Sequence, residues 1–178
     1  MRIIDQRYLD SDNRYSTQPC LLSILEVDDT SATPDALAAF DQRLQAVLPE
    51  VHRQRGLVGM RCADVPQLVQ VVQQVALELR RLAFNEVTLG FVGIVPRMQG
   101  RYRLVLPYAA RNSAAPALAM ATQLVDALMA GRSFNLKAGV AHLRALAERR
   151  AAPRGSLIES ARSLLRAVIP GVAPQPAA

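Results

Sequence analysis

The feature that most constrains this fold is a long amphipathic segment between Asp64 and Phe84. Its apolar residues recur every three or four positions, the spacing at which side chains share one face of an α-helix. Asp64 is placed to cap this helix, and Pro66 falls in its first turn. We expect such a helix to bury its apolar face against a sheet. The residues expected on that face are Leu68, Val71, Val72, Val75, Leu79 and Leu82.

Segments rich in β-favouring residues supply candidate strands for that sheet. RIIDQRYL and CLLSILEV lie near the N-terminus, and the second ends at a pair of aspartates. EVTLGFVGIVPRM and RYRLVLPYAAR, separated by QG, predict a β-hairpin. Because Pro107 has no backbone N–H, the second arm of the hairpin is expected to form an edge or a bulge there.

Helical spacing predicts further helices on both sides of the hairpin. Residues 33–51 begin with Thr33 as N-cap and Pro34 in the first helical position, and 53–60 are expected to form a loop or a short strand. Helices are predicted at 116–131, 135–150 and 155–169, before a disordered tail at 170–178. This order predicts a single α+β domain over residues 1–169. Its small antiparallel or mixed sheet, with β-hairpins, is packed by helices and followed by a C-terminal helical pair.

Charge is distributed unevenly along the chain. Residues 1–50 carry four basic and nine acidic side chains, whereas residues 51–178 carry seventeen basic and six acidic ones. All the basic residues except Lys137 are arginines. Arginine binds carboxylates and phosphates through a planar pair of donors, but a high-GC genome explains the same bias equally well. Only 4% of residues are aromatic and no RNA-binding pattern is found, so no nucleic-acid partner is expected.

The location predicted from the sequence is the cytoplasm, without membrane binding. No apolar run approaches the ~20 residues that a membrane helix needs. The first residues, MRIIDQRYLD, carry charges throughout and lack the apolar core of a signal peptide.

Few residues could support catalysis, and no metal or cofactor is expected. The chain has no phosphate-binding glycine loop and no serine nucleophile motif. His52 is expected in a loop after a helix, and His142 in the middle of one. Cys20 and Cys62 lack the spacing of a metal site and are interpreted as buried thiols.

Three glutamines stand out on the long helix. Gln70, Gln73 and Gln74 have the spacing of the zinc-binding pattern His-x-x-Glu-His. They mark either a metal site that has lost its ligands or simply the polar edge of a helix.

Several segments, in order along nearly the whole chain, resemble the N-terminal domain of cyanophycin synthetase. MRIIDQRYLDSDNRYS resembles its opening strand and turn, with Ser11, Asp12 and Asn13 in the turn that normally contains glycine. VALELRRLA is the segment most similar to the family pattern. GRYRLVLPYAAR is similar to a later strand, with Pro107 where the family often has glutamate. The helices that follow are similar as well.

The resemblance implies a role with cyanophycin, a polyaspartate that carries an arginine on each side chain. In the family, an ATP-grasp module and a Mur-ligase-like module perform the ligations, and neither is present in this sequence. The N-terminal domain is associated with holding the polymer. In some members it also carries a metal-dependent hydrolase, whose His-x-x-Glu-His motif precedes VALEL.

The alignment with that motif implies that the hydrolase chemistry is lost here. The family histidines fall on Gln70 and Gln74, and the glutamate falls on Gln73. A zinc hydrolase needs imidazole ligands and a carboxylate that takes a proton from water. A glutamine amide is a poor zinc ligand and cannot accept a proton near neutral pH.

The resulting expectation is a catalytically silent domain, not an enzyme by itself, that binds or anchors cyanophycin or a related polypeptide during its synthesis. One alternative is a metal-dependent hydrolase that cuts cyanophycin into primers with displaced ligands. Another is a structural domain that docks on a cyanophycin synthetase or associates with itself. The arginines expected to bind polymer from helix surfaces are Arg80, Arg81, Arg144, Arg149, Arg150, Arg162 and Arg166.

Overall fold

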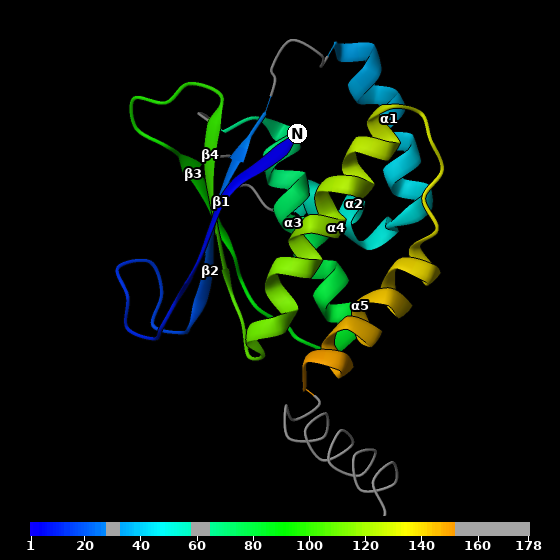
Figure 1. Cartoon of the computed structure of the whole chain (residues 1–178). Helices are drawn as coiled ribbons and strands as arrows, with labels where there is room; N and C mark the ends of the chain where they lie inside the picture. The colour runs from blue at the N-terminus through cyan, green and yellow to red at the C-terminus, as the bar shows by residue number, and fades with distance from the viewer. Residues whose placement is uncertain (28–32, 58–64, 152–178) are drawn as a thin grey trace, which may run out of the picture.

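The computed structural model describes residues 1–27, 33–57 and 65–151, apart from the side chains of residues 54–57 and 149–151. It is an α+β domain, as predicted (Figure 1). The elements, in chain order, are β1 (Arg2–Leu9), β2 (Cys20–Glu26), α1 (Pro34–Val47), α2 (Pro49–Leu57), α3 (Gln67–Phe84), β3 (Phe91–Ile94), β4 (Arg101–Pro107), α4 (Arg111–Met129) and α5 (Leu136–Ala151).

The four strands form one antiparallel sheet in the order β1-β2-β4-β3. Figure 1 shows the five helices of the described residues on one side of this sheet. Leu21, Leu25, Leu104 and Leu106 point to the helical side and are fully buried. The sheet therefore forms one wall of the hydrophobic core, and α3 and α4 pack together above it.

Helix α3 buries the face that its sequence predicts. Leu68, Val71, Val75 and Leu79 are buried, and Leu82 is partly buried against the same core. Burying one such side chain completely stabilises the fold by about 1.5–3 kcal/mol. The helix ends where predicted, because its C-terminal residue is followed by a left-handed cap. The capping residue, Asn85, has φ 56° and donates its backbone N–H to Arg81 O at 3.0 Å.

The start of α3 differs in part from the prediction. Pro66 is the N-cap and offers no side-chain hydrogen bond to the first turn. The predicted cap, Asp64, lies outside the described residues, as do Cys62, the predicted helix at 155–169, the tail at 170–178 and the domain boundary at residue 169.

The single helix predicted for residues 33–51 is wrong, because Pro49 divides it. Thr33 caps α1 as expected, and its Oγ1 accepts from Ala36 N at 3.3 Å. Leu48, which precedes the proline, has φ −135° and ψ 72°, since proline disfavours the helical conformation in the residue before it. Pro49 then begins α2, which includes residues 53–57 of the segment expected to be a loop or a short strand; residues 58–60 lie outside the described parts. His52 consequently lies on a helix, half-buried.

The hairpin is confirmed, but its first strand is shorter than predicted and spans only Phe91–Ile94. β4 is an inner strand, not an edge. Tyr108 donates its N–H to Pro19 O at 3.0 Å on the β2 side, and bonding direction alternates along a strand. The missing N–H of Pro107 therefore faces the β3 side, beyond Val105, the last residue of β4 paired with β3.

Helix α4 begins earlier than predicted, at Arg111 instead of Pro116. Pro116 lies inside the helix, near its N-terminal end, where it still removes one backbone donor. Helix α5 lies where it was predicted, and Asn135 caps it by accepting from Ala138 N at 3.0 Å. Within the described residues, no helix combines the length and apolar character needed to cross a bilayer.

Candidate functional site

The three glutamines lie on the first turns of α3, and none is fully exposed. Gln70 Nε2 donates to Val65 O at 3.0 Å, which ties the side chain to the segment preceding the helix. The Oε1 atom of Gln74 is buried and has no hydrogen-bond partner. Gln73 packs closely against Gly90. A Cβ atom added to that glycine would lie only 2.5 Å from Gln73 Nε2. The amides are therefore packed into the protein surface.

The chemistry of these positions does not match a metal centre. In the part of the chain that the structure describes, no three residues among His, Cys, Asp and Glu gather where they could hold a metal ion. His142 is exposed on α5, and His52 is on α2. The predicted buried state of Cys20 is confirmed, and burial raises the pKa of its thiol, partly offset by a side-chain hydrogen bond with Asn13.

One turn after Gln74, a carboxylate does lie on the same side of α3. Glu78 is only 7% exposed and accepts two hydrogen bonds from Arg81, at 2.7 Å to Nε and 2.7 Å to Nη2. The pairing raises the pKa of Arg81, chiefly through the hydrogen bonds with Glu78, with a smaller contribution from Glu50. Both oxygens of the Glu78 carboxylate are therefore occupied by one guanidinium.

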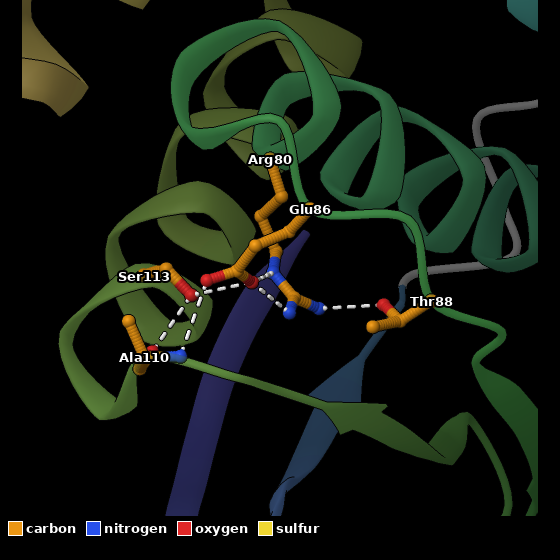
Figure 2. Close-up of polar contacts among 5 residues, drawn as sticks. All are labelled: Arg80, Glu86, Thr88, Ala110 and Ser113. Carbon is orange, nitrogen blue, oxygen red and sulfur yellow. Dashed lines mark hydrogen bonds and ion pairs between the residues drawn. The ribbon is translucent and has the colours of Figure 1, made fainter.

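Arg80, the neighbour of Arg81 in sequence, is fully buried, contrary to the expectation that it lies on the helix surface. Figure 2 shows its guanidinium directed at Glu86 and Thr88, which follow α3. Nε donates to Glu86 Oε2 at 3.1 Å and Nη1 donates to Thr88 Oγ1 at 3.1 Å, while Nη2 donates to Glu86 as well. This guanidinium is committed to the fold and does not reach a ligand at the surface.

Glu86 also holds the start of α4. Its Oε1 accepts from Ala110 N at 3.1 Å and its Oε2 accepts from Ser113 Oγ at 3.0 Å (Figure 2). Ala110 is the N-cap of α4 and has no side chain that could cap the helix itself. Because a carboxylate at a helix N-terminus also meets the positive end of the helix dipole, Glu86 serves α3 and α4 together.

Arg144 is exposed and belongs to the same end of α3. It donates from Nη2 to Leu82 O at 2.7 Å and from Nε to Ala83 O at 3.1 Å. These carbonyls are in the last turn of the helix, where they lack intrahelical partners. The structure thus brings Arg81 and Arg144 to one helix end, although 63 positions separate them in the sequence. The side chains of Arg149 and Arg150, and all of Arg162 and Arg166, lie outside the described parts.

The side of the sheet opposite the helices carries a cluster that the sequence analysis missed. The guanidinium carbon of Arg103 lies 5.2 Å from the ring centre of Tyr15 and 5.9 Å from that of Phe91. Arg14 approaches Tyr15 as well, at 4.7 Å. The alternation in RYRLVLP placed Arg103 on the face opposite the core, but only the folded chain brings it to an aromatic residue of the first turn.

That first turn is built around Asn13. Its Oδ1 accepts from Tyr15 N at 2.9 Å and from Ser16 N at 3.1 Å, and its Nδ2 donates to Asp10 O at 2.7 Å. Asp12 adopts φ 57°, a conformation that favours glycine and that aspartate tolerates better than most residues. The turn expected from the family resemblance is therefore formed without glycine.

Glu26, in the acidic N-terminal part, pairs with Arg101 of the basic remainder. Glu26 accepts from Arg2 at 2.6 Å and from Arg101 at 3.1 Å, and these bonds lower the pKa of its carboxyl group. The amino group of Met1 contacts Asp126 at 3.2 Å. All these pairs leave at least one partner in contact with solvent, so none of them is a major source of stability.

A comparison with known protein families gives one match. Residues 22–130 match the family described as cyanophycin synthase-like N-terminal domain. The match contains most of β2 and all of α3, of both strands of the hairpin and of α4, and therefore includes the three glutamines, Glu78 and the Arg80–Glu86 pair. No curated protein matches the chain. Since the match spans more than half of its residues, the chain belongs to the cyanophycin synthase-like N-terminal domain family.

Proposed function

We propose that this domain binds cyanophycin, or a closely related arginine-bearing aspartate polymer, and does not cut it. Membership of the family supports the choice of polymer. The proposal that the domain does not cut the polymer rests on the composition of α3, where three amides occupy the His-x-x-Glu-His spacing. The next carboxylate on that side, Glu78, is held by Arg81.

The chemistry of the polymer suits the exposed arginines. Cyanophycin displays the free carboxylate and the guanidinium of every attached arginine, so a binder needs cations and carboxylates or aromatic faces in reach of one another. Arg81 and Arg144 offer cations at the end of α3, and the sequence continues with Arg149, Arg150, Arg162 and Arg166. Arg80 is not part of the proposed surface, because it is buried.

Individual contacts of this kind are weak, so tight binding requires many of them along the polymer. An exposed ion pair is worth up to about 1 kcal/mol, and salt weakens it further. A polymer that presents the same side chain at every residue multiplies such contacts through effective concentration. The expected behaviour is binding that is strong at low ionic strength and falls steeply as salt is added.

Co-sedimentation with insoluble cyanophycin at low and high salt tests this proposal. The unchanged domain should pellet with the polymer at low salt and stay in solution at high salt. The variant Arg144→Glu with Arg162→Glu and Arg166→Glu should lose most of this binding.

A control of equal charge separates the surface from net charge. Arg7→Glu, Arg97→Glu and Arg132→Glu change three exposed arginines elsewhere by the same total charge. If the control loses as much binding as the first variant, the assignment of the surface is wrong. Failure of the unchanged domain to pellet at low salt would contradict the binding function itself.

A further inference from the structure

Arg103 lies on the outer face of the sheet, which is turned away from the helices, and has no hydrogen-bond partner among the described residues. Arg43 and Arg101 are half-buried as well, and both donate, Arg43 to Leu128 O at 2.8 Å and Arg101 to Glu26 at 3.1 Å. A partly buried donor without an acceptor costs free energy, so its presence calls for an explanation. Arg103 therefore differs from the half-buried arginines that stabilise the fold.

Two aromatic rings position the guanidinium of Arg103. Its carbon lies 5.2 Å from the ring centre of Tyr15 and 5.9 Å from that of Phe91. Gly93, which pairs with Arg103 across the hairpin, leaves room for this contact. A Cβ atom there would lie 3.0 Å from Phe91 Cε1 and 3.5 Å from Arg103 Nη2. Because a ring attracts the cation without accepting strong hydrogen bonds, the side chain is positioned while its donors stay unpaired.

The donors of Arg103 that can meet a ligand are its two terminal nitrogens. Nε is enclosed by the protein without an acceptor, whereas the terminal nitrogens are not enclosed. Two N–H groups of one planar guanidinium match the two oxygens of a carboxylate. Arg14 is exposed, and its guanidinium carbon lies 4.7 Å from the ring centre of Tyr15. It therefore adds a second positive charge beside the same ring.

In the part of the chain that the structure describes, no carboxylate forms an ion pair with Arg14 or Arg103. Asp5 and Glu26, on the outer face of β1 and β2, already pair with other arginines. Backbone N–H groups do not line the site, since β4 is an inner strand that bonds both of its neighbours. The site thus has two unneutralised guanidinium groups but lacks the backbone amides typical of phosphate-binding loops.

We infer that Arg103 and Arg14 form a carboxylate-binding site on the outer face of the sheet, flanked by the rings of Tyr15 and Phe91. Phe91 is 52% exposed, so part of its ring can contact an apolar or planar group next to the bound carboxylate. The arginine units of cyanophycin have this chemistry, and naming them as the source of the carboxylate rests on the proposed function. The site itself does not, and it is separate from the arginines at the end of α3.

Nuclear magnetic resonance titration of the full chain with Nα-acetylarginine and with its amide tests the site. The acid has a free carboxylate and the amide has none. The backbone amide signal of Gly93, the pairing partner of Arg103, should shift to saturation with the acid only. Arg103→Gln should weaken binding of the acid at least about tenfold, because the charge-assisted donors are lost. Arg132→Gln removes an exposed charge elsewhere and should weaken it less than about twofold.

A second variant separates charge from geometry. Arg103→Lys keeps the charge but loses the planar pair of donors, and should weaken binding as well. Equal shifts with acid and amide, or full affinity of Arg103→Gln for the acid, would overturn the site. Tighter binding of inorganic phosphate than of the acid would overturn the assignment to carboxylates. Circular dichroism verifies that each variant is folded.

Co-sedimentation identifies the source of the carboxylate. If the polymer uses this site, Arg103→Gln should pellet with cyanophycin less than Arg132→Gln does. Equal pelleting, while only Arg132→Gln binds the acid, would show that the site takes small free carboxylates and would leave the proposed function intact. A domain that binds the acid but never pellets would contradict the proposed function and leave the carboxylate site standing.

Discussion

The two halves of α3 differ in how their polar side chains are paired, although both halves are partly buried. The N-terminal half has three uncharged amides, one of which leaves a buried oxygen without a partner at Gln74. The C-terminal half has Glu78, Arg80 and Arg81, each with charge-assisted hydrogen bonds. An unpaired amide oxygen costs much less than an unpaired buried charge. Substitution of the polar residues in the C-terminal half should therefore destabilise the fold strongly, whereas substitution of the glutamines in the N-terminal half should change stability little.

The largest effect in this comparison is expected from Glu86→Gln. The amide keeps an acceptor for Ala110 N, but Arg80 is left as a buried charge without a counter-charge. Removing one partner of a buried pair typically destabilises a protein by 3–5 kcal/mol, so we expect a loss of about 3 kcal/mol. Urea denaturation followed by circular dichroism measures it.

A double variant shows whether charge is the cause. Arg80→Met combined with Glu86→Gln removes both charges and should recover a large part of the lost stability. A loss below about 1 kcal/mol for Glu86→Gln alone would mean that water reaches the pair and that α3 and α4 do not depend on it.

A smaller effect is expected from Glu78→Gln at the neighbouring pair. Arg81 is 47% exposed, so water can solvate its guanidinium when the carboxylate is lost. We expect a loss of about 1 kcal/mol in the free energy of unfolding. A loss as large as that of Glu86→Gln would show that water does not solvate Arg81, and that the Glu78–Arg81 pair behaves like the buried Glu86–Arg80 pair.

The smallest effect is expected in the glutamine half. Gln74→Leu removes a buried oxygen that has no partner and should change stability by between zero and about 1 kcal/mol in the favourable direction. Thermal unfolding against the unchanged chain measures this. Destabilisation by more than about 2 kcal/mol would reveal a hydrogen bond that this oxygen needs.

Much of this comparison could be predicted from the sequence, because it rests on local spacing. The buried face of α3 and its end at Phe84 follow from helical periodicity. The same spacing contained a signal for Arg80, which lies four and eight positions after the buried residues Ala76 and Val72. Its partner could not be predicted, since Glu86 follows the helix and its position depends on the left-handed turn at Asn85.

Other features depend on contacts between distant segments. The division between α1 and α2 was visible in Pro49, whose effect on the preceding residue is local. The meeting of Tyr15 with Arg103 and of Arg144 with the end of α3 required the complete fold. The first arm of the hairpin was predicted as one long strand from Glu86, because alternating apolar residues continue through Val87 and Leu89. In the structure the side chains of Glu86 and Thr88 bond Arg80, and the strand begins only at Phe91.

A restoration experiment sharpens the interpretation of the glutamine half. Gln70→His and Gln74→His with Gln73→Glu install the His-x-x-Glu-His pattern on α3. If the scaffold still holds the spacing of a metal site, this variant should bind Zn²⁺ more tightly than a matched control. The control, Gln67→His with Gln70→His and Gln73→Glu, places its two imidazoles three positions apart. Equal zinc binding by both variants, measured by calorimetry, would contradict a preserved site.

The central claim, binding without cutting, is tested most directly by following cyanophycin and the domain in one time course with added Zn²⁺. The samples are separated into pellet and supernatant at low salt, and both are analysed by gel electrophoresis. If the domain binds without cutting, it moves into the pellet while the length of the polymer stays constant. Shortening of the polymer that a chelator prevents would contradict this claim, as would a domain that remains entirely in the supernatant.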